Sequence, residues 1–257
     1  MKKVVILLAF LFFSGQAYSA DNCLKIEKKL WILQNQIVDK SFRQLSPGAW
    51  AKYSSNIKAV YLGKQISPKT GKKLYVIEYT GGPAGQIWYK LTPKDVTYQD
   101  KTFRYWTLEP MEAYLATSGG VFYLSKAMIE TYMKMTGGSS WSRILKEGSI
   151  LPSPDCRDIT EIKETTYTFP TGKRVKATVI RSKENGAIVY CSPLVPFGMI
   201  NVKSSQENNS NGLIDYGFSD GKAKITKSMA ANAKLFPVLP LNGNINPPDN
   251  FPKFPFK

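Results

Sequence analysis

The 257-residue sequence contains no histidine. Histidine is the commonest general base near neutral pH and the commonest metal ligand in proteins. Its absence excludes the Ser/His/Asp and Cys/His nucleophilic systems. A Ser–Lys pair works without histidine, but no Ser-x-x-Lys pattern here has supporting motifs, and the GxxxxGK[ST] spacing is missing. We therefore expect a protein that is not an enzyme and that has neither a cofactor nor a metal site.

Cysteine is also scarce, with Cys23, Cys156 and Cys191 far apart and none in a CxxC pair. This spacing argues against a metal centre. An odd number of cysteines in an exported chain leaves one thiol over. We predict a disulfide between Cys156 and Cys191, which both belong to the C-terminal β-rich region. Cys23, close to the N-terminus of the mature chain, is expected to stay unpaired.

Long apolar runs are missing except at the N-terminus. Met1-Lys2-Lys3 precedes the unbroken apolar run Val4–Phe13, and small residues follow at Ala17 and Ser19. This order is typical of a cleavable secretory signal peptide, and the run is too short to span a bilayer as a helix. We expect residues 1–20 to be a signal peptide and the mature chain to be periplasmic or extracellular, without a transmembrane span. An uncleaved N-terminal anchor is the alternative.

Acidic residues are outnumbered, since 35 lysines and arginines stand against 19 aspartates and glutamates, a formal net charge of +16. Such an excess favours anionic surroundings, among them lipid phosphates, lipopolysaccharide and acidic polymers. The lysines are spread along the chain without a run of five or six, which indicates a solvated basic surface and not a basic arm. Nucleic acid is not an expected partner of an exported chain.

The residues that are present predict mainly β structure. Apolar residues at helical spacing predict an amphipathic helix over residues 24–45, which ends at Ser46-Pro47-Gly48. Aromatic segments with period-two alternation predict a meander of strands over residues 49–108. Residues 112–115 and 123–135 are expected to be helical.

Strands and hairpins are expected again from residue 159, including a hairpin that turns at Asn185-Gly186 and a last one over residues 213–226. Residues 236–257 are rich in proline and are expected to form an extended or disordered tail. The chain is thus divided into a signal peptide, one β-rich domain over residues 21–235, and this tail.

Two blocks of the sequence resemble known proteins. The N-terminal helix, Trp50-Ala51-Lys52-Tyr53 and the aromatic strands resemble the LolA-type half-barrel carriers of lipoproteins and lipids in the periplasm. The block with Phe169-Pro170-Thr171-Gly172-Lys173, Tyr190-Cys191-Ser192 and Val195-Pro196-Phe197-Gly198 is similar to uncharacterised bacterial secreted proteins that contain a VPFG motif. The first resemblance implies a single curved antiparallel sheet, a half-barrel, with helices on its concave face and acyl chains bound inside.

Two groups of residues are candidates for special roles. Met128, Ile129, Tyr132 and Met133 form one stripe of the predicted helix, and such a stripe is either core or the wall of an apolar ligand site, because methionine adapts to varied apolar shapes. We treat these four as candidate ligand-binding residues. Pro196, Phe197 and Gly198 are expected to form a structural corner with the Phe197 ring in the core.

The function expected from these features is non-catalytic binding. The first hypothesis is an exported carrier that holds a lipid or an acylated partner in an apolar cavity. The alternative is a basic envelope-associated structural or interaction protein that binds anionic polymers.

Overall fold

The structure is a computed structural model that describes residues 20–54, 56–81, 84–98, 101–135, 159–183, 186–203 and 211–236. The predicted signal peptide, apart from Ala20, and residues 237–257 of the predicted tail lie outside the described residues. So do residues 136–158. None of the described helices is both long enough and apolar enough to cross a membrane.

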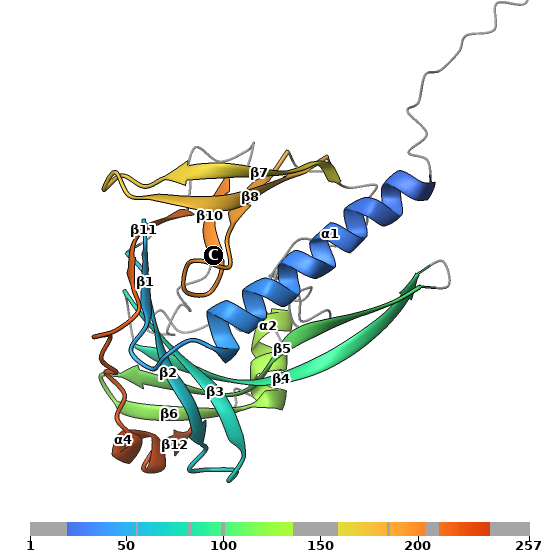
Figure 1. The fold of residues 1–257 in the computed structure, drawn as a ribbon. Helices are drawn as coiled ribbons and strands as arrows, with labels where there is room; N and C mark the ends of the chain where they lie inside the picture. The colour runs from blue at the N-terminus through green and yellow to red at the C-terminus, as the bar shows by residue number, and fades with distance from the viewer. Residues whose placement is uncertain are drawn as a thin grey trace, which may run out of the picture.

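One large curved sheet of twelve strands dominates the described part of the chain, in the order β12-β6-β5-β4-β3-β2-β1-β11-β10-β9-β8-β7 (Figure 1). Neighbouring strands are antiparallel, except that β12 runs parallel to β6. The sheet does not close, which confirms the predicted mainly β half-barrel. The strands are β1 (Trp50–Tyr53), β2 (Lys58–Ile66), β3 (Lys73–Thr80), β4 (Gly85–Tyr98), β5 (Lys101–Thr117), β6 (Gly120–Ser125), β7 (Ile159–Thr168), β8 (Arg174–Ser182), β9 (Ile188–Cys191), β10 (Met199–Lys203), β11 (Asn211–Gly217) and β12 (Lys234–Leu235).

Helix α1 (Ala20–Val38) crosses the concave face of the sheet and continues into a π-helical turn over Asp39–Arg43 (Figure 1). Leu30, Leu33 and Ile37 are buried and share one core cluster with strand residues from both halves of the sheet. The helix predicted over residues 24–45 is therefore confirmed. Its apolar stripe fills much of the concave side, because a curved sheet must bury its inner face against another element.

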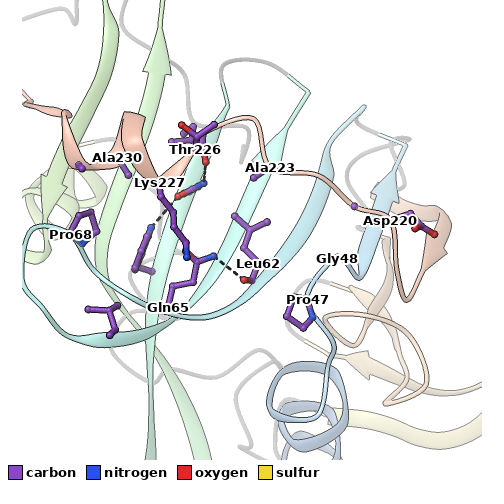
Figure 2. Close-up of a pocket in the computed structure, with 16 residues that line it drawn as sticks. Pro47, Gly48, Leu62, Gln65, Pro68, Asp220, Ala223, Thr226, Lys227 and Ala230 are labelled. Carbon is purple, nitrogen blue, oxygen red and sulfur yellow. Dashed lines mark hydrogen bonds between the residues drawn. The ribbon is translucent and has the colours of Figure 1, made fainter.

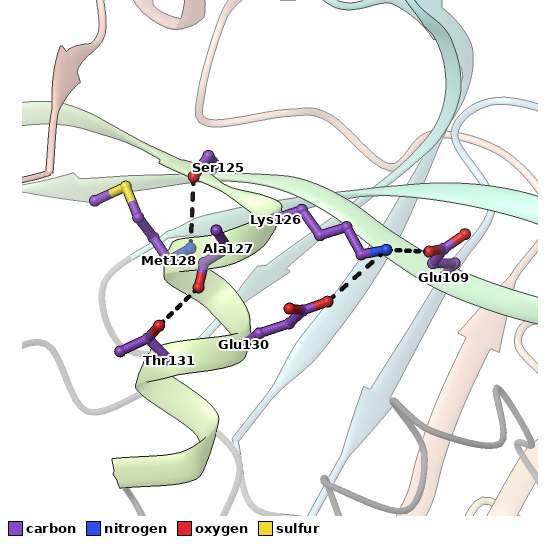
Figure 3. Close-up of polar contacts among 7 residues, drawn as sticks. All are labelled: Glu109, Ser125, Lys126, Ala127, Met128, Glu130 and Thr131. Carbon is purple, nitrogen blue, oxygen red and sulfur yellow. Dashed lines mark hydrogen bonds and ion pairs between the residues drawn. The ribbon is translucent and has the colours of Figure 1, made fainter.

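Helix α2 (Lys126–Met135) packs on the same inner side, against β5 and β6. Ile129 is buried with Ala113, Leu115 and Leu124, and Met128 is partly buried beside them. Figure 3 shows Lys126 in the first turn of α2 forming an ion pair with Glu109 of β5 and approaching Glu130 at 3.8 Å. These contacts fix the start of the helix on the sheet.

The convex face of β3 to β6 is covered by the C-terminal segment, residues 218–236, which contains α4 (Lys227–Ala231) and ends by adding β12 to the edge of the sheet beside β6. Ile225, Ala230 and Ala233 of this segment share a second core cluster with outward-facing side chains of β3 to β6, among them Trp88 and Tyr114. The Thr226 side chain caps α4 by accepting a hydrogen bond from the Met229 backbone N–H at 3.2 Å. Both faces of β3, β4 and β5 are therefore buried over part of their length.

Two predicted helical segments are wrong for this reason. Residues 112–115, expected to be helical, belong to β5, and residues 123–125 belong to β6. Glu112 and Tyr114 are buried on the outer face while Ala113 and Leu115 are buried on the inner face. A strand covered on both faces loses its alternation of apolar and polar residues, so that its pattern resembles a helix. Residues 222–226, expected as a strand, lie on the convex face as an irregular segment.

The corner at Pro196, Phe197 and Gly198 joins β9 to β10, and all three residues are buried. The Phe197 ring meets Phe42 edge to face with centroids 5.8 Å apart. Ser41 donates a hydrogen bond to the Val195 carbonyl at 2.9 Å. The corner thus packs on the C-terminal end of α1, which places Phe197 in the main core cluster.

The predicted disulfide between Cys156 and Cys191 is wrong, because Cys191 carries a free, fully buried thiol. Cys191 lies opposite Thr178 of β8, and its Sγ donates to the Thr178 carbonyl at 3.6 Å. Cys23, expected to be unpaired, is disulfide-bonded. Cys156 lies outside the described residues. The spacing of three cysteines could not reveal that β8–β9 pairing directs Cys191 into the core.

The Cys191 thiol is expected to resist alkylation in the folded protein. Burial raises its pKa to about 12, so that at pH 8 the reactive thiolate is roughly a thousandfold scarcer than for an ordinary cysteine. Mass spectrometry after brief iodoacetamide treatment should find Cys191 unlabelled in buffer and fully labelled in urea. Prompt labelling of Cys191 in the native protein would contradict its burial.

Candidate functional site

A groove lies on the convex side of the sheet, between the outer face of β2 to β4 and the C-terminal segment. Its volume is about 660 Å³. Leu62, Ile66 and Trp88 contribute its sheet wall, and Ile225 and Ala230 contribute the opposite wall. Figure 2 shows Leu62 and Ala230 on these two walls. Size and lining are those of small-molecule sites, which are mostly apolar with a few polar groups.

The polar groups at the floor of the groove are engaged with one another. The Gln86 amide nitrogen donates to the Ile225 carbonyl at 2.7 Å and to Glu78 at 3.0 Å. Trp88 Nε1 donates to Gln86 Oε1 at 3.3 Å, and the Gln65 amide donates to the Leu62 carbonyl at 2.9 Å. The polar side chains of the floor are thus already paired within the protein.

Lys227 is the cation of the groove. It lies in the first turn of α4, and Figure 2 shows its side chain extending across the groove towards Gln65. Asp220 lines the far end of the groove, where its carboxylate accepts a hydrogen bond from Ser219 at 2.7 Å. The mouth of the groove thus offers one ammonium group that can meet an anionic group above an apolar floor.

Glu78 holds the C-terminal segment on the sheet. Its side chain is 0% exposed, and its two carboxylate oxygens accept the backbone N–H groups of Lys224 and Ile225 at 2.6 and 2.9 Å. Together with Gln86, this carboxylate replaces the strand pairing that residues 222–226 lack. Glu78 and Gln86 thus hold the middle of this wall, while the Gly221 N–H, which donates to the Gly48 carbonyl at 2.8 Å, holds its beginning.

A second buried carboxylate, Glu112, fixes the β2–β3 turn beside the groove. Ser67 donates to Glu112 Oε2 at 2.6 Å, Thr70 donates to Oε1, and Tyr114 donates to Oε2 at 3.3 Å. Burial, as the largest cause, raises the pKa of Tyr114 above its ordinary range. The phenol therefore stays protonated and keeps donating, which anchors the turn that carries Pro68 into the groove wall.

The predicted ligand-binding residues do not reach this groove. Met128 and Ile129 pack on the inner face of β5 and β6, on the opposite side of the sheet. The side chains of Tyr132 and Met133 lie outside the described part of the structure. The concave face, where the resemblance implies acyl binding, is occupied by the apolar stripe of α1. The described contacts of Met128 and Ile129 are packing contacts with β5 and β6, and their role in binding a ligand stays a prediction.

Sequence analysis missed the residues that form the groove. Gln86 and Trp88 belong to a predicted strand, but nothing in the sequence shows which face of that strand is covered. The useful signal was the composition of residues 218–236, where small residues and lysines surround Ile225, the one isoleucine of the segment. That pattern fits an irregular segment lying on a surface better than a second hairpin strand.

Comparisons with known proteins give no relative for this chain. No family model, curated protein or solved structure matches it. Among the described residues, no three cysteine, aspartate or glutamate side chains gather where they could hold a metal ion.

Proposed function

We propose that the protein is an exported, non-catalytic carrier that binds the acyl chain of a lipid or of an acylated partner in the convex-face groove. The observation that carries this proposal is the groove itself, with about 660 Å³ of volume and walls formed by Leu62, Ile66, Trp88 and Ile225. Moving an acyl chain from water onto such an apolar surface is favourable, by roughly 0.8 kcal/mol for each CH₂ that is buried.

The position of Lys227 suggests how the ligand is oriented in the groove. An acyl chain along the apolar floor would place its carboxylate or phosphate at the mouth, where the ammonium group of Lys227 extends. The ion pair at such an exposed mouth contributes less to the affinity than the burial of the chain. Lys227 would thus set which end of the ligand stays outside.

The proposal that the groove binds the ligand is tested by filling the groove with a large side chain. Ala223 lines the groove and its side chain is exposed, so tryptophan there occupies the groove without displacing buried packing. We expect Ala223→Trp to lower the binding of a fluorescent fatty acid at least tenfold, about 1.4 kcal/mol. Ala127→Trp is the matched control, because Ala127 is an exposed alanine on α2, on the other side of the sheet.

The natural ligand is tested by mass spectrometry of lipids released when the protein purified from envelope extract is denatured. A stoichiometric acyl species from the wild type, reduced in Ala223→Trp and retained in Ala127→Trp, is the expected result. A wild-type protein that releases no lipid and takes up no fatty acid would refute the carrier proposal. Equal loss in both tryptophan variants would refute the groove as its site.

The alternative function is a basic envelope-associated protein that binds anionic polymers. It is favoured by the net charge of +16 and by the many lysines that are exposed, such as Lys25, Lys28 and Lys29 along α1. Salt separates the two functions, because attraction between exposed charges is screened over about 8 Å at physiological ionic strength. Binding of a polymer should weaken steeply with salt, whereas an acyl chain in the groove should respond little.

A further inference from the structure

The surface around the groove carries an unusual concentration of positive charge. The β2–β3 turn with its flanks, residues 66–73, and the C-terminal segment, residues 218–236, together contain seven lysines and one acidic residue, Asp220. We call this surface the lysine rim. Its lysines, all of them exposed, are Lys69, Lys72, Lys73, Lys222, Lys224, Lys227 and Lys234.

The seven lysines of the rim outnumber the three carboxylates near them, those of Asp220, Glu78 and Glu112. The nearby carboxylates of Glu78 and Glu112 are 0% and 2% exposed and are engaged in hydrogen bonds inside the protein. None of the seven lysines forms an ion pair with a described residue. Figure 1 shows the β2–β3 turn, α4 and β12 at one end of the molecule, away from the start of α1.

Large apolar side chains stand among these lysines. Ile66 is 70% exposed at the end of β2, Leu235 is 66% exposed in β12, and Met229 is 40% exposed in α4. Scattered exposed apolar residues are ordinary, but of the seven large apolar side chains that are exposed in the described residues, these three and Phe218 belong to the segments of the lysine rim. Lysines and exposed apolar side chains together are the composition of surfaces that bind anionic bilayers.

We infer that the lysine rim is a docking surface for a bilayer that contains anionic phospholipids, with the lysines on the phosphates and Ile66, Met229 and Leu235 in the interface. This inference rests on the proposed function, because it places the mouth of the groove against the membrane from which an acyl chain would enter. Charge complementarity selects the partner, since a zwitterionic bilayer offers no net charge to the lysines.

The experiment is sedimentation with vesicles of phosphatidylcholine alone or with phosphatidylglycerol added. The rim variant is Lys72→Gln, Lys222→Gln and Lys234→Gln, none of which lines the groove. The matched control is Lys25→Gln, Lys28→Gln and Lys29→Gln, which removes the same charge from the exposed face of α1. Losing three lysines near an anionic surface should weaken binding roughly 100-fold, while the control should bind like the wild type.

The contribution of the exposed apolar residues to vesicle binding is measured with Leu235→Ser at high salt. We expect Leu235→Ser to reduce the fraction of protein that stays on anionic vesicles at 0.5 M NaCl, where attraction between exposed charges is largely screened. Wild-type binding to phosphatidylcholine alone at the same strength as to anionic vesicles would overturn the inference. Equal loss in the rim variant and the α1 control would also overturn it, in favour of a diffuse charge that binds any anionic polymer.

The groove and the rim can fail separately. Fatty acid delivered without vesicles should bind the rim variant as it binds the wild type, since the substituted lysines lie outside the groove. If fatty acid uptake is absent while anionic vesicles still bind through the rim, the carrier function fails and the docking surface stands. If the protein takes up fatty acid but does not bind anionic vesicles, the docking surface is refuted and the carrier function stands.

Discussion

Replacing Glu78 with alanine is expected to destabilise the protein by about 3–5 kcal/mol, because each buried donor left without an acceptor costs ~1–3 kcal/mol. Glu78 is fully buried and accepts hydrogen bonds from the backbones of Lys224 and Ile225 and from Gln86. Alanine leaves the two backbone donors unpaired and opens a cavity, while the Gln86 amide keeps its hydrogen bond to the Ile225 carbonyl. The loss should appear as a lower midpoint of urea unfolding measured by tryptophan fluorescence.

The control for this prediction is Glu164→Ala, since Glu164 is exposed on β7 and its loss should change stability by no more than about 0.5 kcal/mol. Hydrogen exchange adds a local measurement, because the amides of Lys224 and Ile225 should lose protection before the rest of the sheet does. Glu78→Gln keeps one acceptor oxygen and should fall between wild type and alanine. Similar stability of Glu78→Ala and Glu164→Ala would mean that Glu78 does not hold the C-terminal segment.

Gly198→Ala is the second substitution with a large expected effect, a destabilisation of about 2–5 kcal/mol from strain and overpacking together. Gly198 has φ of 74°, a backbone conformation that costs other residues free energy. A Cβ added there would also lie 2.2 Å from Cγ2 of Ile37, which is 0% exposed and cannot move aside. Thermal unfolding followed by circular dichroism measures the loss.

Gly172→Ala separates strain from overpacking. Gly172 has φ of 80°, but a Cβ added there meets no atom within 4 Å. Its substitution should therefore cost only the conformational part, about 1–2 kcal/mol. If the two alanine variants were equally stable, the contact between the β9–β10 corner and α1 would be looser than described here.

The sequence was sufficient for features that depend on local pattern. The apolar stripe of α1, with Leu30, Leu33 and Ile37, repeats at helical spacing and is buried as expected. The alternation in β3 predicted a strand, and the structure pairs that strand with β2 and β4. Local spacing is enough here, because each of these elements shows one apolar face to the core.

The sequence was insufficient wherever a second layer covers an element. Residues 112–115 were expected to be helical because the pattern cannot distinguish a strand buried on both faces from a buried helix. The convex-face groove depends on Ile225 reaching Glu78 and Gln86, residues that lie about 140 positions earlier in the chain. The burial of Cys191 depends on the pairing of β9 with β8 and β10. Contacts of this kind leave no trace in local spacing.

The position of β1 in the strand order also determines how the chain must fold. β1 is hydrogen-bonded to β2 on one side and to β11 on the other, so that Trp50 pairs with Gly217. In the meanders β2–β6 and β7–β11, each strand pairs with its neighbour in the sequence, so these meanders can form early. The pairing of β1 with β11 joins the two meanders, and it brings together strands that most of the chain separates. Such long-range pairing slows folding to milliseconds or longer. A chain that has not yet reached residue 211 leaves one edge of β1 open to other strands, and the sheet becomes continuous only after nearly the whole protein has been synthesised.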